Sequence, residues 1–283
     1  MKRNAIARII IYSFIILILV SILLAGLGIG MFTYRIDAQT ETYTMGSGEI
    51  PAREINEIAI EWAAGTINIQ TADTDTITFQ EAGNQNAEPM VYRQNGNKLT
   101  IEYQASKIHF GFSVSNNKEL TVIVPKDWYG HQLSVDAASA DLFINGLTAD
   151  DVELNMASGD CHISQCDITN LDLDCASGEI YYVGTLKTLD CSAASGKVTA
   201  VLENIPSSID FDGASADLEL TLPEDAGFTV ELDTLSGHFS SEFETTRRGE
   251  LYICGNGGCK IDVEGMSGNV TIHKATHDIP NTR

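Results

Sequence analysis

The sequence predicts an all-β protein: a single-domain β-solenoid with about 19 residues and two short strands per rung, following one N-terminal transmembrane helix. Three observations predict it. A long apolar run lies near the N-terminus, a short Ser-Gly turn returns about every 19 residues, and polar and apolar residues alternate between these turns. A fixed repeat of this length is typical of stacked repeat architectures.

The apolar run extends from Ile9 to Phe32 and contains no charged residue and no proline. At about 1.5 Å per residue it reaches roughly 36 Å, which is enough to cross a hydrocarbon core of about 30 Å. Basic residues precede the run, whereas Asp37 and Glu41 follow it. This asymmetry predicts a cytoplasmic N-terminus and a single-pass protein of the cell membrane, with the C-terminal domain on the extracytoplasmic side.

A cleaved signal peptide is the alternative, and small residues such as Ala25, Gly26 and Gly28 leave a cleavage site open. The run is longer than the usual apolar core of about 7 to 15 residues in signal peptides, which favours the anchor. We therefore divide the chain into a cytoplasmic N-terminus (1–8), a transmembrane helix (9–32), a stalk (33–57), the solenoid (58–273) and a C-terminal tail (274–283).

The part of the chain after the apolar run is strongly acidic. Residues 35 to 283 hold all 39 acidic residues and 14 of the 17 basic ones, a net charge of 14 − 39 = −25. Binding to nucleic acid requires a basic surface, so this class of partner is excluded. Cations, cationic peptides or other basic surfaces fit the charge better.

The repeat is carried by seven turns with a serine at their centre. The serines are 19, 19, 18, 20, 21 and 31 residues apart, at positions Ser139, Ser158, Ser177, Ser195, Ser215, Ser236 and Ser267. Glycine follows five of these serines, and we expect it to adopt a positive φ where the chain turns between two layers. Ala140 and Ala216 occupy the same place in the other two turns.

Alternating residues between the turns predict strands with one buried face, because side chains point to opposite faces along a strand. Leucine-rich repeats have a similar period, but the second arm of each rung here is also a strand pattern. Stacked rungs predict inward columns. After the turn these are Leu142, Cys161, Ile180, Val198, Leu218, Phe239 and Val270, with Ile144, Ile163, Tyr182, Ala200 and Leu220 beside them; on the return strand they are Leu154, Leu173, Leu189 or Cys191, Phe211 and Val230.

These turns resemble those of a bacterial family of unknown function labelled "putative adhesin". The segment Ala64-Gly65-Thr66-Ile67-Asn68-Ile69, the strand and proline of residues 120–125 and the N-terminal anchor are also similar to that family. The resemblance covers roughly residues 55 to 273. It implies a β-solenoid at a bacterial surface, with some members tied to cell-envelope stress, and it supplies no catalytic residues. The six cysteines and the 31-residue interval depart from the family pattern.

The outward positions of the return strand are mostly acidic. Stacking predicts two parallel columns: Glu153, Asp172, Asp190, Asp210 and Glu231, and one step along the strand Asn155, Asp174, Ser192, Asp212 and Asp233. Like charges about 4.8 Å apart repel by roughly 0.9 kcal/mol even in water. We interpret the columns as a solvated acidic face that attracts cations. Asp172, Asp174, Asp210 and Asp212 are its candidate Ca²⁺ ligands, because this ion prefers several oxygen ligands.

Six cysteines in an exported domain raise the question of pairing. Cys254 and Cys259 flank the turn Gly255-Asn256-Gly257-Gly258, and we predict a small disulfide loop between them. Cys161, Cys175 and Cys191 lie at predicted inward positions, where a free cysteine behaves as a small hydrophobic residue. Their redox state is left open by the sequence.

No phosphate-binding loop, nucleophile elbow or metalloprotease helix is present, and no cofactor is expected. We therefore predict a surface-display or binding module without enzymatic activity, whose partner is a cationic peptide, a cell-wall polymer or a protein. The alternative is a cell-envelope-stress sensor or regulator that acts through a membrane partner. A carbohydrate-active enzyme built on paired carboxylates is a third, weaker interpretation.

Overall fold

The computed structural model describes residues 43–83, 88–103, 118–128 and 130–275. The predicted helix at 9–32 and most of the tail at 274–283 lie outside these residues. In the part of the chain that is described, no helix is both long and apolar enough to span a membrane. Apart from one short 3₁₀ turn, η1 (Ala52–Glu54), every described element is a β-strand, and all strands belong to one continuous sheet. The all-β prediction is confirmed.

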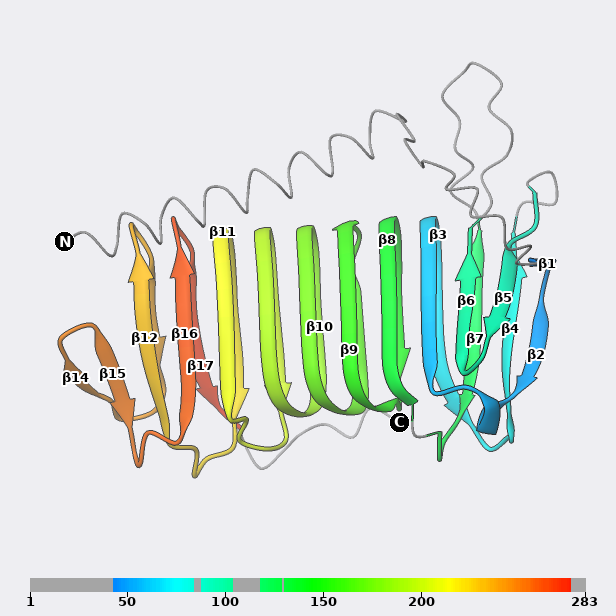
Figure 1. The fold of residues 1–283 in the computed structure, drawn as a ribbon. Helices are drawn as coiled ribbons and strands as arrows, with labels where there is room; N and C mark the ends of the chain where they lie inside the picture. Colours follow the sequence, from blue (N-terminus) through cyan, green and yellow to red (C-terminus); the bar gives the residue numbers. More distant parts are fainter. Residues whose placement is uncertain (1–42, 84–87, 104–117, 129, 276–283) are drawn as a thin grey trace, which may run out of the picture. The chain divides into compact units, whose positions relative to one another are not determined.

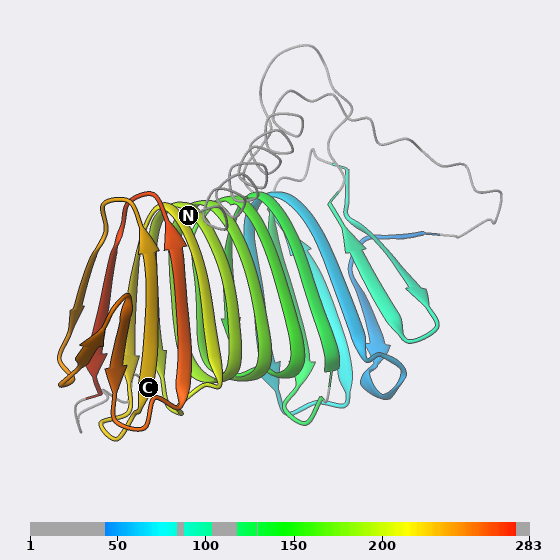
Figure 2. The same cartoon turned by 60° about the vertical axis from the view of Figure 1, so that its left-hand side comes forward.

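The middle of the domain consists of long strands that turn from one layer into the other and pair in parallel with the next rung (Figures 1 and 2). These strands are β3 (Glu57–Ala72), β8 (Gly130–Asn145), β9 (Thr148–Ser158), β10 (Cys161–Leu202) and β11 (Ser208–Leu222). Residues one rung apart are partners: Leu142 pairs with Cys161, and Leu154 with Leu173. The repeat read from the serines is therefore the spatial repeat.

The predicted inward columns form the core. Leu142, Cys161, Ile180, Val198, Leu218 and Val270 are each at most 4% exposed, and Phe239 is partly buried against them. The second column and the return-strand residues are buried as well. Burial of one such aliphatic side chain contributes about 1.5 to 3 kcal/mol relative to exposure. Each rung depends on its neighbours for this burial, because one rung covers only part of its apolar face.

The glycines of the Ser-Gly turns allow neighbouring rungs to approach closely. Gly159, Gly178, Gly196 and Gly268 have φ between +115° and +148°, as predicted, whereas Gly237 does not have a positive φ. A Cβ atom on Gly178 would lie 2.0 Å from the carbonyl oxygen of Gly159 in the preceding rung. Glycine is therefore needed here both for its backbone conformation and for its lack of a side chain.

The acidic residue that follows the Ser-Gly or Ser-Ala pair of a turn accepts a hydrogen bond from the backbone of the next rung. Asp141 Oδ1 accepts the backbone N–H of Asp160 at 3.0 Å, and Asp160 Oδ1 accepts that of Glu179 at 2.9 Å. Asp217 Oδ1 accepts the N–H of Asn269 at 2.7 Å in the same way. These carboxylates thus satisfy backbone donors at the turn, which explains why an acid recurs at this place.

The N-terminal part of the domain is less regular. The first half of β3 pairs in parallel with β6 (Lys98–Glu102) and its second half with β7 (Glu119–Pro125). Two antiparallel additions complete this end. β4 (Thr76–Ala82) joins β7 and β2 (Gly48–Pro51), and β5 (Val91–Asn95) joins β6 and β1 (Thr44–Met45).

These pairings correct the described part of the expected stalk at 33–57, namely residues 43–57; residues 33–42 lie outside the described residues. Residues 44–51 form β1 and β2, and the compact unit begins at Tyr43. Ile50 and Ile55 are buried in the core. The segment lacks the turn repeat of the later rungs, so the sequence pattern alone placed it outside the fold.

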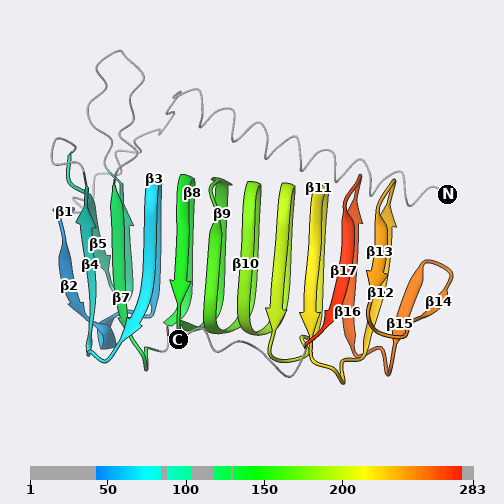
Figure 3. The same ribbon diagram turned by 180° about the vertical axis from the view of Figure 1, so that it is seen from behind.

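The C-terminal rungs do not stack in chain order. β16 (Cys259–Gly265) pairs with both β11 and β12 (Phe228–Thr234), and β17 (Asn269–Lys274) pairs with both β11 and β13 (His238–Ser241). The last rung in sequence is thus inserted before the preceding one (Figure 3). Val230 consequently adjoins Ile261, and Ile261 adjoins Ile209, whereas the sequence columns placed Val230 beside Phe211.

The 31-residue interval provides the additional chain for this rearrangement. It contains β14 (Thr246–Arg248) and β15 (Leu251–Cys254), an antiparallel hairpin in which β15 pairs with the open edge of β12. The hairpin covers the last strand of the stack and places two arginines on its outer strand. Charged residues on an outer strand oppose pairing with other chains.

Candidate functional site

The two columns of carboxylates run along one layer of the domain, the layer that contains β6, β12 and β16 in Figure 1. We call the two together the acidic face. In spatial order, the first acidic column is Glu153, Asp172, Asp190, Asp210, Asp262 and Glu231, and the second is Glu102, Glu61, Asp136, Asn155, Asp174, Ser192, Asp212, Glu264 and Asp233.

The predicted residues are therefore in place, but both columns are longer than the sequence indicated. Asp262 and Glu264 separate Asp210 and Asp212 from the acids of β12. At the other end Glu61, Glu102 and Asp136 extend the second column. The alternating segment Ile261-Asp262-Val263-Glu264 could have signalled this extension, because it repeats the pattern Leu171-Asp172-Leu173-Asp174.

Crowding of the carboxylates changes their acidity. The pKa of Asp212 is raised to about 6, because neighbouring rungs partly remove it from water and because Glu264, Asp190, Asp210 and Asp174 repel its negative charge. Partial desolvation, followed by repulsion from adjacent acids, also raises the pKa of Asp172, Asp190 and Glu264. The face thus holds more negative charge than its surroundings neutralise.

Positive groups and amides offset only part of this charge. Lys260 bonds Asp262 beside the first column, and the Asn155 amide donates to Asp136 at 2.9 Å and to Glu153 at 3.2 Å. In this way Asn155 links the two columns where an acid would add repulsion. The arrangement can attract and hold diffuse positive charge along several rungs.

The four candidate Ca²⁺ ligands do not surround one point. Asp190 lies between Asp172 and Asp210, and Ser192 lies between Asp174 and Asp212. Two strand spacings, about 9.6 Å, therefore separate the members of each pair. Among the described residues, no group of three or more His, Cys, Asp or Glu side chains is arranged to hold a metal ion. One ion bound by all four is excluded, and weaker binding of Ca²⁺ along the columns stays a prediction.

The raised pKa of Asp212 predicts that stability increases on mild acidification. A carboxyl group whose folded-state pKa exceeds the unfolded value binds protons more tightly in the folded state. Its favourable contribution is full below the unfolded value of 3.8 and is lost as the pH rises through about 6. We expect thermal unfolding to occur a few degrees higher at pH 5 than at pH 7.5. Solvent still reaches part of the Asp212 side chain and screens its charge, so we assign only about 1 kcal/mol to this effect.

Asp212→Asn provides the control for this prediction. The variant removes the titrating group and keeps the shape of the side chain, so it should be more stable than the parent at pH 7.5. It should also show a smaller rise in melting temperature between pH 7.5 and pH 5. An unchanged pH dependence would show that Asp212 does not titrate in this range.

One family model matches most of this chain. The family model described as Toastrack DUF4097 matches residues 55–184 and again residues 131–273, which together span most of the sequence. The chain belongs to the Toastrack DUF4097 family. The double match agrees with a domain built from repeated rungs, because overlapping stretches of the same chain fit the same pattern.

Several solved structures are similar to this Toastrack chain at low sequence identity. A "putative adhesin" from Bacteroides fragilis is 14% identical, with 82% of this chain and 98% of that chain covered and a TM-score of 0.45. A "putative cell adhesion protein" from Clostridium sporogenes is 11% identical, with coverages of 83% and 100% and a TM-score of 0.38. A "putative adhesin" from Parabacteroides distasonis is 15% identical, with coverages of 83% and 98% and a TM-score of 0.36. No curated protein matches the chain.

The cysteines of this Toastrack domain are all buried free thiols. Cys254 and Cys259 flank Phe228 from opposite sides, because β15 and β16 are the two neighbours of β12. Two strand spacings place their Cα atoms about 9 to 10 Å apart, whereas a disulfide requires roughly 4.4 to 6.8 Å. The predicted disulfide loop is therefore wrong for this structure: the glycine-rich turn connects two strands that a third strand separates.

The other predicted inward cysteines, Cys161, Cys175 and Cys191, are at most 4% exposed. Burial, with smaller contributions from neighbouring thiols and acids, raises the pKa of Cys191 well above its usual value. These groups stay protonated near neutral pH and pack as small apolar side chains, as predicted.

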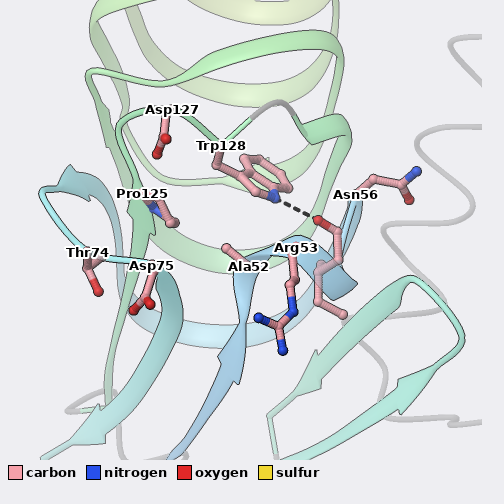
Figure 4. Close-up of a pocket in the computed structure, with 9 residues that line it drawn as sticks. Ala52, Arg53, Asn56, Thr74, Asp75, Pro125, Asp127 and Trp128 are labelled. Atoms are coloured by element: carbon pink, nitrogen blue, oxygen red, sulfur yellow. Dashed lines mark hydrogen bonds between the residues drawn. The ribbon is translucent and has the colours of Figure 1, made fainter.

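A hollow of about 390 Å³ lies at the N-terminal end of the Toastrack domain (Figure 4). The turns around η1, β4 and β7 surround it, and its lining is Ala52, Arg53, Ile55, Asn56, Thr74, Asp75, Pro125, Asp127 and Trp128. Trp128 is fixed in this wall because its indole N–H donates to the backbone oxygen of Ile55 at 2.8 Å. The sequence did not indicate this hollow, whose residues come from three separate turns.

Proposed function

We propose that this Toastrack chain is an extracytoplasmic binding module, held at the membrane by residues 9–32, that presents its acidic face to a cationic partner. The observation that supports the proposal is the unbroken first acidic column, in which Glu153, Asp172, Asp190, Asp210, Asp262 and Glu231 occupy six neighbouring rungs. Repeated charges at the strand spacing match an extended partner better than a compact one.

The charge of the face favours a polycation over a single metal ion. A metal ion requires several oxygen atoms around one point, which the columns do not provide among the described residues. An extended basic peptide can instead place one positive side chain near each rung. Association would be rapid and sensitive to salt, because electrostatic attraction acts before contact and is screened by ions.

Binding of a lysine octapeptide to the purified full chain tests the proposal. At low ionic strength we expect measurable binding by titration calorimetry. Replacing Asp172, Asp190 and Asp210 together with asparagine should weaken it by about tenfold, because three consecutive charges are lost from one column. Adding salt should weaken binding to the parent chain more than binding to the variant.

The matched control changes the same number of charges away from the acidic face. Glu224, Asp225 and Glu244 are exposed in loops, and their conversion to glutamine or asparagine alters the net charge by the same amount. This variant should retain nearly full affinity. Equal weakening in both variants would attribute binding to net charge and refute a specific role for the columns; absence of binding to the parent chain would refute the proposal itself.

A further inference from the structure

The opposite layer of the domain carries three ring side chains on consecutive rungs. These outward side chains are Phe143 from the second half of β8, and His162 and Tyr181 from two successive rungs of β10. They lie in the layer that contains β7, β13 and β17 in Figure 3. We call these three residues the aromatic row. The Phe143 and His162 rings stack with centroids 5.3 Å apart and an angle of 4°, and the Tyr181 ring lies 6.2 Å from His162.

The row keeps a large apolar surface in contact with water. Phe143 and Tyr181 are each 41% exposed, although both are large aromatic side chains. Val183 lies two residues after Tyr181, and Val201 lies at the same place one rung further on; both are only partly buried and extend the apolar surface. Contiguous exposed apolar surface marks interaction sites on soluble proteins, whereas single exposed side chains do not. Stacking also restrains the rings, so that a ligand would meet an ordered surface.

Polar groups border the row on both sides. On one side, Asp160 and Glu179 precede His162 and Tyr181 by two residues, and the backbone N–H of Glu179 holds the Asp160 carboxylate in place at 2.9 Å. On the other side, Asn145 Nδ2 donates to Ser164 Oγ at 2.8 Å. Asn145 keeps its amide oxygen and one amide N–H for a ligand, and Ser164 keeps its hydroxyl hydrogen. The border therefore offers fixed acceptors and donors on both sides of an apolar strip.

The size and charge of this surface restrict its occupant. The three rings and two valines are far fewer than the roughly 20 to 30 residues that each side of a stable protein interface contributes, which argues against a second copy of the chain. The net charge of −25 over residues 35–283 also opposes self-association and excludes nucleic acid. A ligand recognised by positive charge alone would prefer the acidic face, where the carboxylates are denser.

We propose that the aromatic row binds a neutral polysaccharide chain that lies along the stack of rungs. A sugar ring presents apolar C–H groups together with hydroxyl groups that both donate and accept hydrogen bonds. The row supplies apolar ring surface for the C–H groups of the sugar. Hydrogen-bond partners for its hydroxyl groups come from Asp160, Glu179, Asn145 and Ser164. This site is separate from the acidic face and does not depend on the function proposed for it.

Affinity electrophoresis of the purified full chain tests the proposal. Native gels would contain hydroxyethyl cellulose, laminarin, dextran or glycol chitin, one polymer per gel. We expect at least one polymer to retard the parent chain. The double substitution Phe143→Ala and Tyr181→Ala should weaken binding to that polymer about tenfold or more, as judged from the polymer concentration that gives half-maximal retardation. Circular dichroism would confirm that the variant is folded.

The matched control substitutes two residues of the same outward column away from the row. Thr271 and Ser240 bond each other at 3.1 Å, and replacing both with alanine should leave retardation unchanged. The variant Asp172→Asn, Asp190→Asn, Asp210→Asn should also bind the polysaccharide normally, which separates this site from the acidic face. Failure of all four polymers to retard the parent chain overturns the proposal, as does equal retardation of the aromatic-row variant. A row variant that loses only lysine octapeptide binding would assign the row to a basic peptide and equally overturn it.

Discussion

Replacing Gly178 with alanine is expected to destabilise the domain by about 4 kcal/mol, which is a large part of the stability of a typical domain. Two costs add at this position. The backbone has φ of +148°, which L side chains rarely adopt, and the new Cβ atom would lie 2.0 Å from the carbonyl oxygen of Gly159. Backbone strain and overpacking each cost about 1 to 3 kcal/mol. Urea unfolding measures the difference between the two proteins.

Gly96→Ala separates the two costs. Gly96 also has a positive φ, +61°, but no atom lies within 4 Å of the place where its Cβ would be. This variant should lose only about 1 kcal/mol, the cost of the backbone conformation. If the Gly178 and Gly96 variants were equally destabilised, close approach between rungs would not be the reason for glycine in the Ser-Gly turns.

Lys118→Met is expected to destabilise the N-terminal part of the domain by about 3 to 5 kcal/mol. The Lys118 side chain is 2% exposed, and its Nζ lies 2.6 Å from Glu81 Oε1 and 2.6 Å from the backbone oxygen of Glu88. Nζ also lies 4.3 Å from the centre of the Tyr103 ring. Methionine removes the charge and leaves the largely buried Glu81 carboxylate without its cation, which accounts for the cost. Urea unfolding at pH 7.5 again gives the measurement.

A second substitution tests the cause. Lys118→Met combined with Glu81→Leu removes both charges and should be clearly more stable than Lys118→Met alone, because no unpaired charge remains buried. Lys98→Met is the exposed comparison, since Lys98 and Glu57 form an ion pair near the surface, and it should cost less than about 1 kcal/mol. If the double variant were no more stable than the single one, loss of packing rather than charge would explain the effect.

The sequence predicted the regular part of the fold because its signals are local and repeated. Ser139, Ser158 and their successors mark each turn, and alternation between turns separates inward from outward side chains. Once the rungs are stacked in parallel, both the apolar columns and the acidic columns follow from the repeat. The repeat alone therefore assigns Asp172, Asp190 and Asp210 to one column, and the strand pairing confirms it.

The remaining parts depend on contacts that no local pattern encodes. The aromatic row is an exception: its position follows from the repeat, but Phe143, His162 and Tyr181 are three different residue types, so no recurring motif marks the row in the sequence. The hollow beside Trp128 is formed by three turns far apart in the chain. Lys118, which immediately precedes β7, is likewise buried beside Glu81 of β4, and no sequence repeat relates these two positions.

The sequence by itself determined the repeat, the Ser-Gly turns, the inward columns and the strongly acidic return strand, because each follows from residue spacing and the alternation of side chains along a strand. Only the tertiary structure decided that β16 and β17 are inserted between β11 and the rung of β12 and β13. That insertion separates Cys254 from Cys259 and adds Asp262 and Glu264 to the acidic columns. The physical reason is that a strand has two edges, and residue spacing does not specify which edge a returning segment will join.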